Sequence, residues 1–279
     1  MVTRVSTRVV DATTLDRLVE IAREAGAAIL EYYAPFRGGM NPAPTEAGVR
    51  WKADRSPVTA ADLASHATIV AALGDLFPDI PIVSEEGGMP TLEAQRGLAR
   101  FWLVDPLDGT KEFISGNGEF TVNIALIEGA EPVAGVVYTP VQDVTYYGAA
   151  GLGAWKRAPG GEAPVRLQSS PPVPGQPLIV VESRSHPSAE LDAWLATVPV
   201  ARRVAVGSSL KFCWVADGTA DVYPRFGPTM EWDVAAGDCV FRCSGRDRPR
   251  RSPLRYNKPG LRNGAFVIGL EGQEDADVP

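Results

Sequence analysis

Residues 101–113 read FWLVDPLDGTKEF, an apolar run of four residues followed at once by an acidic segment. The apolar run 101–104 is short and is bounded by acidic and proline turn residues, which predicts a buried strand. Asp105 and Asp108 then lie at the carboxyl end of that strand. Ligand sites of open α/β sheets gather at the carboxyl ends of strands, so this one stretch predicts both a sheet and a site.

The spacing of these two aspartates suits a metal ion. A turn at the intervening proline allows both carboxylates and the carbonyl of Leu107 to face one point. Hard cations such as Mg²⁺ prefer carboxylate, carbonyl and water oxygens. Gly109 and Thr110 come next and open a short helix, whose N–H groups suit a phosphate. Two cations about 4 Å apart would hold the attacking water and the leaving oxygen of an in-line displacement.

Acidic residues elsewhere in the chain favour the same interpretation. Glu85 follows the apolar pair 82–83, and Asp233 opens an Ala/Gly-rich segment with helical spacing. Asp62 ends a Thr59-x-x-Asp62 pattern that also fits a helix capping box. Ordinary turn chemistry is the better explanation of any one cluster taken alone, because Asp-Pro and Asp-Gly pairs are common in turns. Spacing alone therefore makes a metal site plausible without proving it.

Helical and strand patterns alternate along the rest of the chain. Apolar residues at three- and four-residue steps predict helices, and short apolar runs between Gly, Pro or acidic residues predict strands. The predicted helices are 15–33, 59–76, 188–196, 209–217 and 232–243, and the predicted strands are 82–83, 101–104, 121–127, 133–138, 144–147, 154–156, 178–181, 204–206, 221–223 and 264–269. This mixture predicts a layered α/β or α+β fold.

The segments between these elements predict loops and one domain. Residues 35–50 form a polar loop, and the glycines of 148–153 indicate a hairpin turn more than a nucleotide site. No linker of serine, glycine or charged residues divides the chain. We expect a single domain over 1–279, with halves of about 1–170 and 171–279.

Charge and composition exclude several classes of protein. The chain is 45% hydrophobic and 22% charged, as globular proteins are. Its net charge of −7 argues against a nucleic-acid partner, and the basic run 246–251 is expected to be a solvated loop. An acidic protein that handles a phosphate ester must supply positive charge locally, and a bound metal ion is the obvious source.

Cysteine usage and the first residues indicate a reducing compartment. The odd, sparse set Cys213, Cys239 and Cys243 predicts reduced thiols, and zinc would need more ligands than two histidines supply. The N-terminus lacks the apolar core of a signal peptide, and no apolar run approaches membrane-spanning length. We therefore expect a cytoplasmic protein without a transmembrane segment; peripheral association with the inner membrane stays open.

Four motifs in order identify a resemblance that covers residues 15–267. They are DRSPVTAAD at 54–62, VSEEG at 83–87, WLVDPLDGTKEF at 102–113 and EWDVAAG at 231–237. With them the chain resembles the inositol monophosphatase superfamily of lithium-sensitive, Mg²⁺-dependent phosphatases. The resemblance implies a layered α-β-α-β-α sandwich, bound Mg²⁺ (two or three ions per site) and inhibition by Li⁺.

Within the superfamily, the chain is most similar to the bacterial 3'(2'),5'-bisphosphate nucleotidases of the CysQ type. KEF at 111–113, GSSLKFC at 207–213 and YPRFGPT at 223–229 are typical of that branch. The substrate that this implies is adenosine 3',5'-bisphosphate, which loses its 3'-phosphate to give AMP. The segment 243–257 departs from the family pattern, because its basic run replaces a glycine-rich turn and a short strand.

The resemblance also implies a role for each matching residue. The implied metal ligands are Glu85, Asp105, Asp108 and Asp233 with the carbonyl of Leu107. All of them except Asp105 are also implied to contact the substrate. The implied catalytic residues are Asp62 and Thr110, which position and deprotonate the attacking water, together with Glu85. Gly109 and Thr110 hold the phosphate by their N–H groups, and the implied nucleotide contacts are Ser208, Lys211, Arg225 and, on a looser match, His186.

Simpler roles stay open for the two cations. A helix lysine at 211 can extend its ammonium to solvent, and Arg225 can be a surface charge at a strand end. If instead they meet the second phosphate of a bisphosphate nucleotide, they supply charge-assisted contacts that an inositol phosphate does not need.

Other functions compete with this one. An inositol-1-phosphatase or a broad sugar phosphatase would share the metals and mechanism. A regulatory metal-binding protein without turnover would have no need of the pair Asp62 and Thr110. A serine hydrolase is disfavoured, since no Gly-x-Ser-x-Gly motif is present and the chain has 2 histidines.

Overall fold

The computed structural model describes residues 10–34, 36, 50–51, 57–186 and 188–270. Most of the loop predicted over 35–50 and the start of the 54–62 motif lie outside the described residues. No helix among the described residues has the length and apolar character needed to cross a membrane.

A large sheet forms the centre of the described part of the chain, with seven strands in the order β3-β4-β5-β6-β7-β8-β9. Its strands are β3 Ile82–Ser84, β4 Arg100–Asp108, β5 Thr121–Glu128, β6 Glu131–Thr139, β7 Val144–Ala149, β8 Gly153–Arg157 and β9 Val165–Arg166. β3 pairs in parallel with β4, and the remaining pairs are antiparallel. β4 and β5 are buried along nearly their whole length, which explains their continuous apolar sequences.

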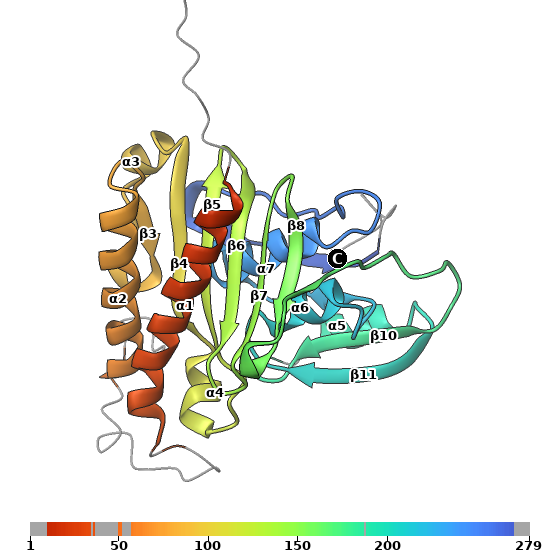
Figure 1. Cartoon of the computed structure of the whole chain (residues 1–279). Coiled ribbons are helices and arrows are strands. Elements are labelled where there is room, and N and C mark those ends of the chain that lie inside the picture. Colours follow the sequence, from red (N-terminus) through yellow and green to blue (C-terminus); the bar gives the residue numbers. More distant parts are fainter. Residues whose placement is uncertain (1–9, 35, 37–49, 52–56, 187, 271–279) are drawn as a thin grey trace, which may run out of the picture.

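Two helices, α1 Ala12–Tyr33 and α2 Ala60–Leu76, cover one face of this sheet (Figure 1). On the other face lies α7 Glu231–Cys243, which contacts β4 to β8 and is joined by α6 Leu210–Ala216. Both packings bury apolar faces, and the two resulting core clusters lie on opposite sides of the sheet.

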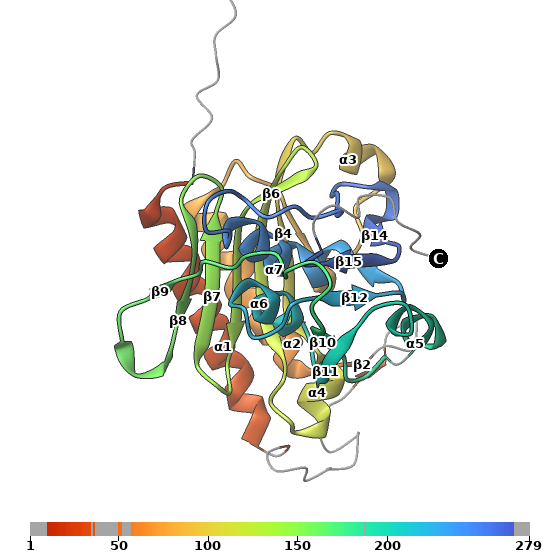
Figure 2. The ribbon, with the colours of Figure 1, turned by 90° about the vertical axis from the view of Figure 1, so that its right-hand side faces the viewer.

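The C-terminal half adds a further layer of strands. β10 Leu178–Ser183 pairs in parallel with β11 Val200–Val206, and β12 Tyr223–Arg225 pairs with β15 Phe266–Ile268. α5 Ala189–Leu195 packs on the outer side of these strands through a third apolar cluster (Figure 2). The order helix, sheet, helix, strand layer, helix is the predicted α-β-α-β-α sandwich, so the predicted fold class is confirmed.

Short elements complete the described chain. They are β1 Arg50–Trp51, β2 Pro57–Val58, α3 Leu92–Arg96, α4 Thr110–Ser115, β13 Thr229–Met230, β14 Arg262–Asn263, and 3₁₀ turns at Glu85–Gly87, Pro159–Gly161 and Pro259–Leu261. The hairpin predicted at 148–153 is present, because Ala149 pairs with Gly153.

Four predictions need correction. The strand predicted over 204–206 begins four residues earlier, because β11 starts at Val200. β4 does not end at residue 104 but continues to Asp108 through a register shift against β5. β12 begins two residues later than the strand predicted over 221–223. The basic run 246–251 is not wholly solvated, since Arg250 is buried and donates hydrogen bonds to Ser169 and to the carbonyl of Gly269.

Candidate active site

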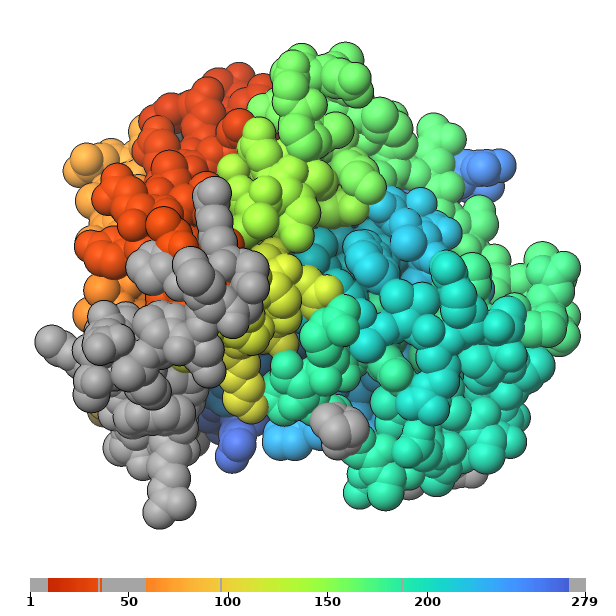
Figure 3. All heavy atoms as spheres, turned by 90° about the horizontal axis from the view of Figure 1, so that it is seen from below, coloured from red at the N-terminus to blue at the C-terminus, as the bar shows by residue number. Residues whose placement is uncertain are grey.

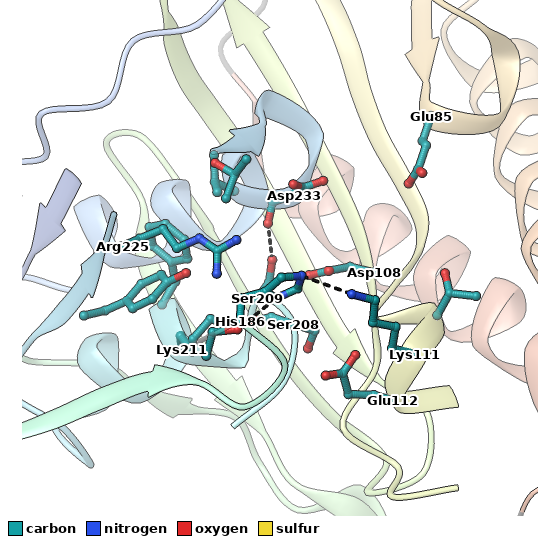
Figure 4. A pocket seen from close by; sticks show the side chains of 17 residues that line it. Glu85, Asp108, Lys111, Glu112, His186, Ser208, Ser209, Lys211, Arg225 and Asp233 are labelled. Carbon is teal, nitrogen blue, oxygen red and sulfur yellow. Dashed lines mark hydrogen bonds between the residues drawn. The ribbon is translucent and has the colours of Figure 1, made fainter. Parts of the chain in front are cut away.

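A pocket of about 200 Å³ opens between the end of β4, the start of α4 and the C-terminal half (Figure 4). It brings together nine of the predicted site residues: Glu85, Asp108, Gly109, Thr110, His186, Ser208, Lys211, Arg225 and Asp233. Asp62, Asp105 and Leu107 are buried residues that do not line it. The pocket therefore unites residues from distant parts of the sequence. Glu85 and Asp108 lie on one side of it and Lys211 and Arg225 on the other, with Lys111 on the side of the first two.

The irregular end of β4 positions the first acids. A register shift against β5 separates the paired positions of Asp105 and Asp108. Within it, the Leu107 N–H donates to Oδ1 of Asp105 at 3.1 Å. The predicted turn at the proline is thus a bulge in a continuing strand. It buries Asp105 while Asp108 faces the pocket.

These carboxylates repel one another. Burial, followed by the charges of Glu85 and Asp108, holds the pKa of Asp105 well above its usual range. Burial and then Asp108 do the same to the pKa of Asp233. Burial raises the pKa of Asp108 to about 6, although Lys211 opposes that shift.

The donor set fits a hard divalent cation, because a cluster of buried carboxylates with mutual repulsion is the environment that such a cation neutralises. As placed, no group of three or more acidic, histidine or cysteine side chains among the described residues is arranged to hold a metal ion. The assignment of Glu85, Asp105, Leu107, Asp108 and Asp233 as metal ligands stays a prediction that rests on donor chemistry.

Asp62 forms the predicted helix cap and also contacts Thr110, while its catalytic role stays a prediction. Its Oδ2 accepts hydrogen bonds from the N–H of Thr59 at 2.8 Å and the hydroxyl of Thr59 at 2.6 Å, so the capping box at the start of α2 is present. Its other oxygen accepts the hydroxyl of Thr110 at 3.4 Å. Burial raises the pKa of Asp62 to about 6. The buried carboxylate is therefore connected directly to a hydroxyl that lines the pocket.

Gly109 explains how the chain turns from β4 into α4. It precedes the helix with φ of 94°, a left-handed conformation that favours glycine. An added Cβ would lie 3.2 Å from a carboxylate oxygen of Glu112. The turn places Thr110 at the first position of the helix, beside the acids.

Lys211 is not a lysine that extends to solvent. Its residue is 5% exposed, and its ammonium donates to the Ser208 carbonyl at 2.5 Å and lies 5.4 Å from the ring centroid of Tyr223. Burial lowers its pKa to about 8, against the attraction of Asp108. Arg225, as predicted, ends a strand, but it is partly buried and lines the pocket; its guanidinium donates to the carbonyls of Gly227 and Pro228.

Ser208 and His186 complete the cationic side. Ser208 has a φ of 51°, and its buried hydroxyl has no hydrogen-bond partner among the described residues. Partial burial and the charges of Arg225 and Lys111 lower the pKa of His186 to about 4. Its Nδ1 lies 3.2 Å from the Ser183 hydroxyl.

Asn123 and Ser209 belong to the site and were not predicted. The Asn123 amide donates to Asp108 at 3.3 Å and to the Ser209 hydroxyl at 2.9 Å, and that hydroxyl donates to the backbone carbonyl of Asp233 at 2.5 Å. The pair therefore links two acids from distant segments. A polar residue in the middle of the apolar run 121–127 was the available signal for Asn123.

Comparisons with known proteins agree with the motifs. A model described as "Inositol monophosphatase family" matches residues 11–248. The 3'(2'),5'-bisphosphate nucleotidase CysQ of Escherichia coli strain K12 is 48% identical over 231 residues, which cover 83% of this chain and 88% of that protein. The protein of the same name from Haemophilus influenzae is 31% identical over 81% of this chain and 80% of its own.

Solved structures show the same fold. The crystal structure of CysQ from Bacteroides thetaiotaomicron, described as a bacterial member of the inositol monophosphatase family, has a TM-score of 0.73 and 38% identity. The alignment covers 91% of this chain and 96% of that one. An inositol monophosphatase from Anabaena has a TM-score of 0.66 and 27% identity, with 91% and 89% of the chains covered.

Proposed function

This chain belongs to the inositol monophosphatase family, and we propose that it acts as a Mg²⁺-dependent 3'(2'),5'-bisphosphate nucleotidase. Its reaction is removal of the 3'-phosphate of adenosine 3',5'-bisphosphate, which gives AMP and phosphate. The observation that carries this proposal is the two-sided pocket, in which acids face Lys211 and Arg225. A substrate with two phosphates uses both sides of the pocket, the acidic side for one phosphate and the cationic side for the other.

The acidic side binds the phosphate that leaves. Mg²⁺, when held by the carboxylates of Glu85, Asp105, Asp108 and Asp233 with the Leu107 carbonyl, supplies positive charge to the phosphate and the attacking water. Asn123 and Ser209 keep Asp108 and the backbone at Asp233 in place for this task.

Asp62 and Thr110 handle the proton of the attacking water. Asp62 accepts a hydrogen bond from the Thr110 hydroxyl, which leaves the lone pairs of that oxygen free to accept a hydrogen bond from the attacking water. With a pKa of about 6, Asp62 is ionised at neutral pH yet basic enough to take up a proton relayed through Thr110. The N–H groups of Gly109 and Thr110 bind the phosphate oxygens.

The cationic side selects the substrate. Lys211 and Arg225 face the second, non-scissile phosphate. Ser208 lines the same pocket, and its buried hydroxyl has no partner among the described residues. His186 borders the same region and lies among cations in the free protein. Charge-assisted contacts of this kind favour a bisphosphate nucleotide over a monophosphate.

A substrate panel tests the proposal. Purified protein treated with EDTA should release no phosphate, and Mg²⁺ should restore release. Adenosine 3',5'-bisphosphate should then be hydrolysed with a higher kcat/KM than inositol 1-phosphate, and Li⁺ should inhibit. Full activity in EDTA would refute the metal dependence, and a preference for inositol 1-phosphate would indicate an inositol phosphatase instead. Binding of Mg²⁺ without turnover of any substrate would indicate a regulatory protein.

A further inference from the structure

The loop after β10 connects the two halves of the chain beside the pocket. Three successive side chains of residues 184–186, here called the bridging segment, contact the N-terminal half. Arg184 pairs with Glu119, Ser185 donates a hydrogen bond to Glu112, and His186 lies with Nε2 3.5 Å from the ammonium of Lys111. Figure 3 shows the yellow atoms of the α4 region beside the teal atoms of the C-terminal half. One wall of the pocket is therefore formed where the halves meet.

The pair of Arg184 and Glu119 has the most defined geometry of these contacts. The arginine donates from Nε to Oε2 and from Nη2 to Oε1, both at 2.7 Å, which is a bidentate fork. Oε2 of Glu119 also accepts the backbone N–H of Gly207 at 2.8 Å. Nη2 of Arg184 also donates to the carbonyl of Ala205 at 2.6 Å. One ion pair thus fixes the loop before β5, the end of β10 and the end of β11.

The backbone held by this pair leads directly to the predicted substrate contacts. Gly207 precedes Ser208, whose φ is 51°, and the Ser208 carbonyl accepts the Lys211 ammonium. The backbone at Gly207 also lies close to the N-terminal half, since an added Cβ would be 2.6 Å from Cγ of Glu112. A shift of Gly207 would therefore move both the hydroxyl of Ser208 and the anchor of Lys211.

We propose that the Arg184–Glu119 ion pair positions Ser208 and Lys211 for the non-scissile phosphate. This inference rests on the proposed function, because it assigns a purpose to the cationic side of that same pocket. Neither residue lines the pocket, so the pair acts through the Gly207 backbone. The pair joins two halves, with Arg184 exposed and Glu119 partly exposed, so we expect its loss to affect binding of the second phosphate more than folding.

The chain offers a matched control. Arg203 and Glu182 form another ion pair, with side-chain exposures of 46% and 17%, against 46% and 20% for Arg184 and Glu119. Both control residues belong to the paired strands β10 and β11, so their contact does not join the halves. Substitution of Arg203 therefore removes a comparable surface charge without releasing Gly207.

The experiment compares Glu119→Gln, Arg184→Met and the double variant with Arg203→Met. We expect the KM for adenosine 3',5'-bisphosphate to rise about 5- to 20-fold in the first three, with kcat changed less than about 2-fold. The KM for adenosine 3'-monophosphate, which lacks the 5'-phosphate, should stay within about 2-fold. The KM of the double variant should be little higher than that of either single variant, because all three variants remove the same interaction. Arg203→Met should match the wild type.

An equal rise in KM for adenosine 3',5'-bisphosphate and adenosine 3'-monophosphate would overturn the inference. So would the same rise in KM in Arg203→Met. A lowered kcat with a lowered Tm would instead indicate a structural role and would also overturn it. AMP carries only the 5'-phosphate. Its Kd, measured by calorimetry, therefore tests the role of the Arg184–Glu119 pair without any turnover. Its Kd should rise in Glu119→Gln and Arg184→Met even if the wild type proves to hydrolyse another substrate. An unchanged Kd would contradict the inference, whereas absent hydrolysis would contradict only the proposed function.

Discussion

Lys211 is a charged side chain that the surrounding protein keeps out of water. Burial lowers its pKa to about 8, so it is still mainly protonated at pH 7, and the nearby negative charge of Asp108 only partly compensates. A buried cation requires a partner, and we propose that the second phosphate of the substrate provides one. Arg225 lines the same pocket with part of its guanidinium accessible.

Lys211→Ala and Arg225→Ala should therefore separate nucleotide from inositol chemistry. Each removes a charge-assisted contact that contributes about 1.5–3 kcal/mol, or about a 10- to 100-fold fall in kcat/KM. The fall should be confined to substrates with a second phosphate, as steady-state assays on adenosine 3',5'-bisphosphate and inositol 1-phosphate will measure. The exposed Arg202 provides a control, and Arg202→Ala should change neither rate. Equal losses on both substrates would mean that these residues support the fold or the metal site.

Asp62→Asn tests the water-activating pair. The amide can still accept the N–H of Thr59, so the helix cap is largely kept, but it cannot take up a proton. We expect kcat to fall by about 100-fold or more, while loss of cap strength costs at most about 2 kcal/mol of unfolding free energy. Asp11→Asn alters the cap of α1 in the same way, away from the pocket, and should leave kcat unchanged. An active Asp62→Asn enzyme would reduce Asp62 to a capping residue.

At the scale of helices and strands, local pattern predicts most elements and misses what depends on pairing. α2 begins after Thr59 and ends at Leu76 as its cap and proline signals indicate. The extension of β4 to Asp108 depends on its register with β5, which no spacing within residues 101–113 reveals. The short pair β13 and β14 joins segments more than 30 residues apart and went unpredicted for the same reason.

The same contrast between local pattern and long-range pairing applies to the site residues. The motifs identified Glu85, Asp108 and Asp233, which the fold brings to one pocket. Asn123 acquires its role only because β5 pairs it opposite Asp105, and its amide then reaches Asp108. The burial of Arg250 likewise depends on partners far along the chain, so composition alone predicted a solvated loop.

Gly135 determines how closely α7 approaches the sheet. An added Cβ there would lie 2.6 Å from the carbonyl oxygen of Ala236 and 2.7 Å from Cβ of Cys239. Gly135→Ala should therefore push away the helix that carries Asp233, lowering the free energy of unfolding by about 1–3 kcal/mol and reducing kcat.

Thermal unfolding and activity assays check this prediction. The control is Gly74→Ala in α2, where an added Cβ meets nothing within 4 Å. That change should be neutral or stabilising, because alanine favours a helix over glycine. Wild-type stability in Gly135→Ala would show that α7 can move without cost.

Across the whole molecule, the pocket lies where the two halves meet. The division into 1–170 and 171–279 and the cytoplasmic location stay predictions. The halves contribute opposite charge: the N-terminal half supplies Glu85 and Asp108, whereas Lys211 and Arg225 come from the C-terminal half. There are two exceptions: Lys111 is a cation from the N-terminal half, and Asp233 is an acid carried by a C-terminal helix that packs on the central sheet. Substrate and metal binding are thus expected to stabilise the assembly of both halves.

The buried acids link stability to pH and to Mg²⁺. The pKa of Asp108 is about 6 in the folded protein and 3.8 ordinarily, so between these values the folded state retains a proton that the unfolded state has lost. Its contribution to stability is therefore full below about pH 3.8 and is lost as the pH rises through about 6. Asp62 shifts in the same direction, whereas the lowered pKa of His186 has the opposite effect.

A difference between variants separates Asp108, and the acids Asp105 and Asp233 whose pKa values its charge raises, from Asp62 and His186. In EDTA, the unfolding free energy of wild type minus that of Asp108→Asn should fall by about 1 kcal/mol between pH 5 and pH 7. Mg²⁺ should raise the Tm of the wild type more at pH 7 than at pH 5, because it binds ionised carboxylates, and should raise that of Asp108→Asn less. Denaturant titrations and thermal scans measure both effects. A Mg²⁺ effect that is equal at both pH values, or equal in both proteins, would show that the cation binds elsewhere than at this acidic cluster.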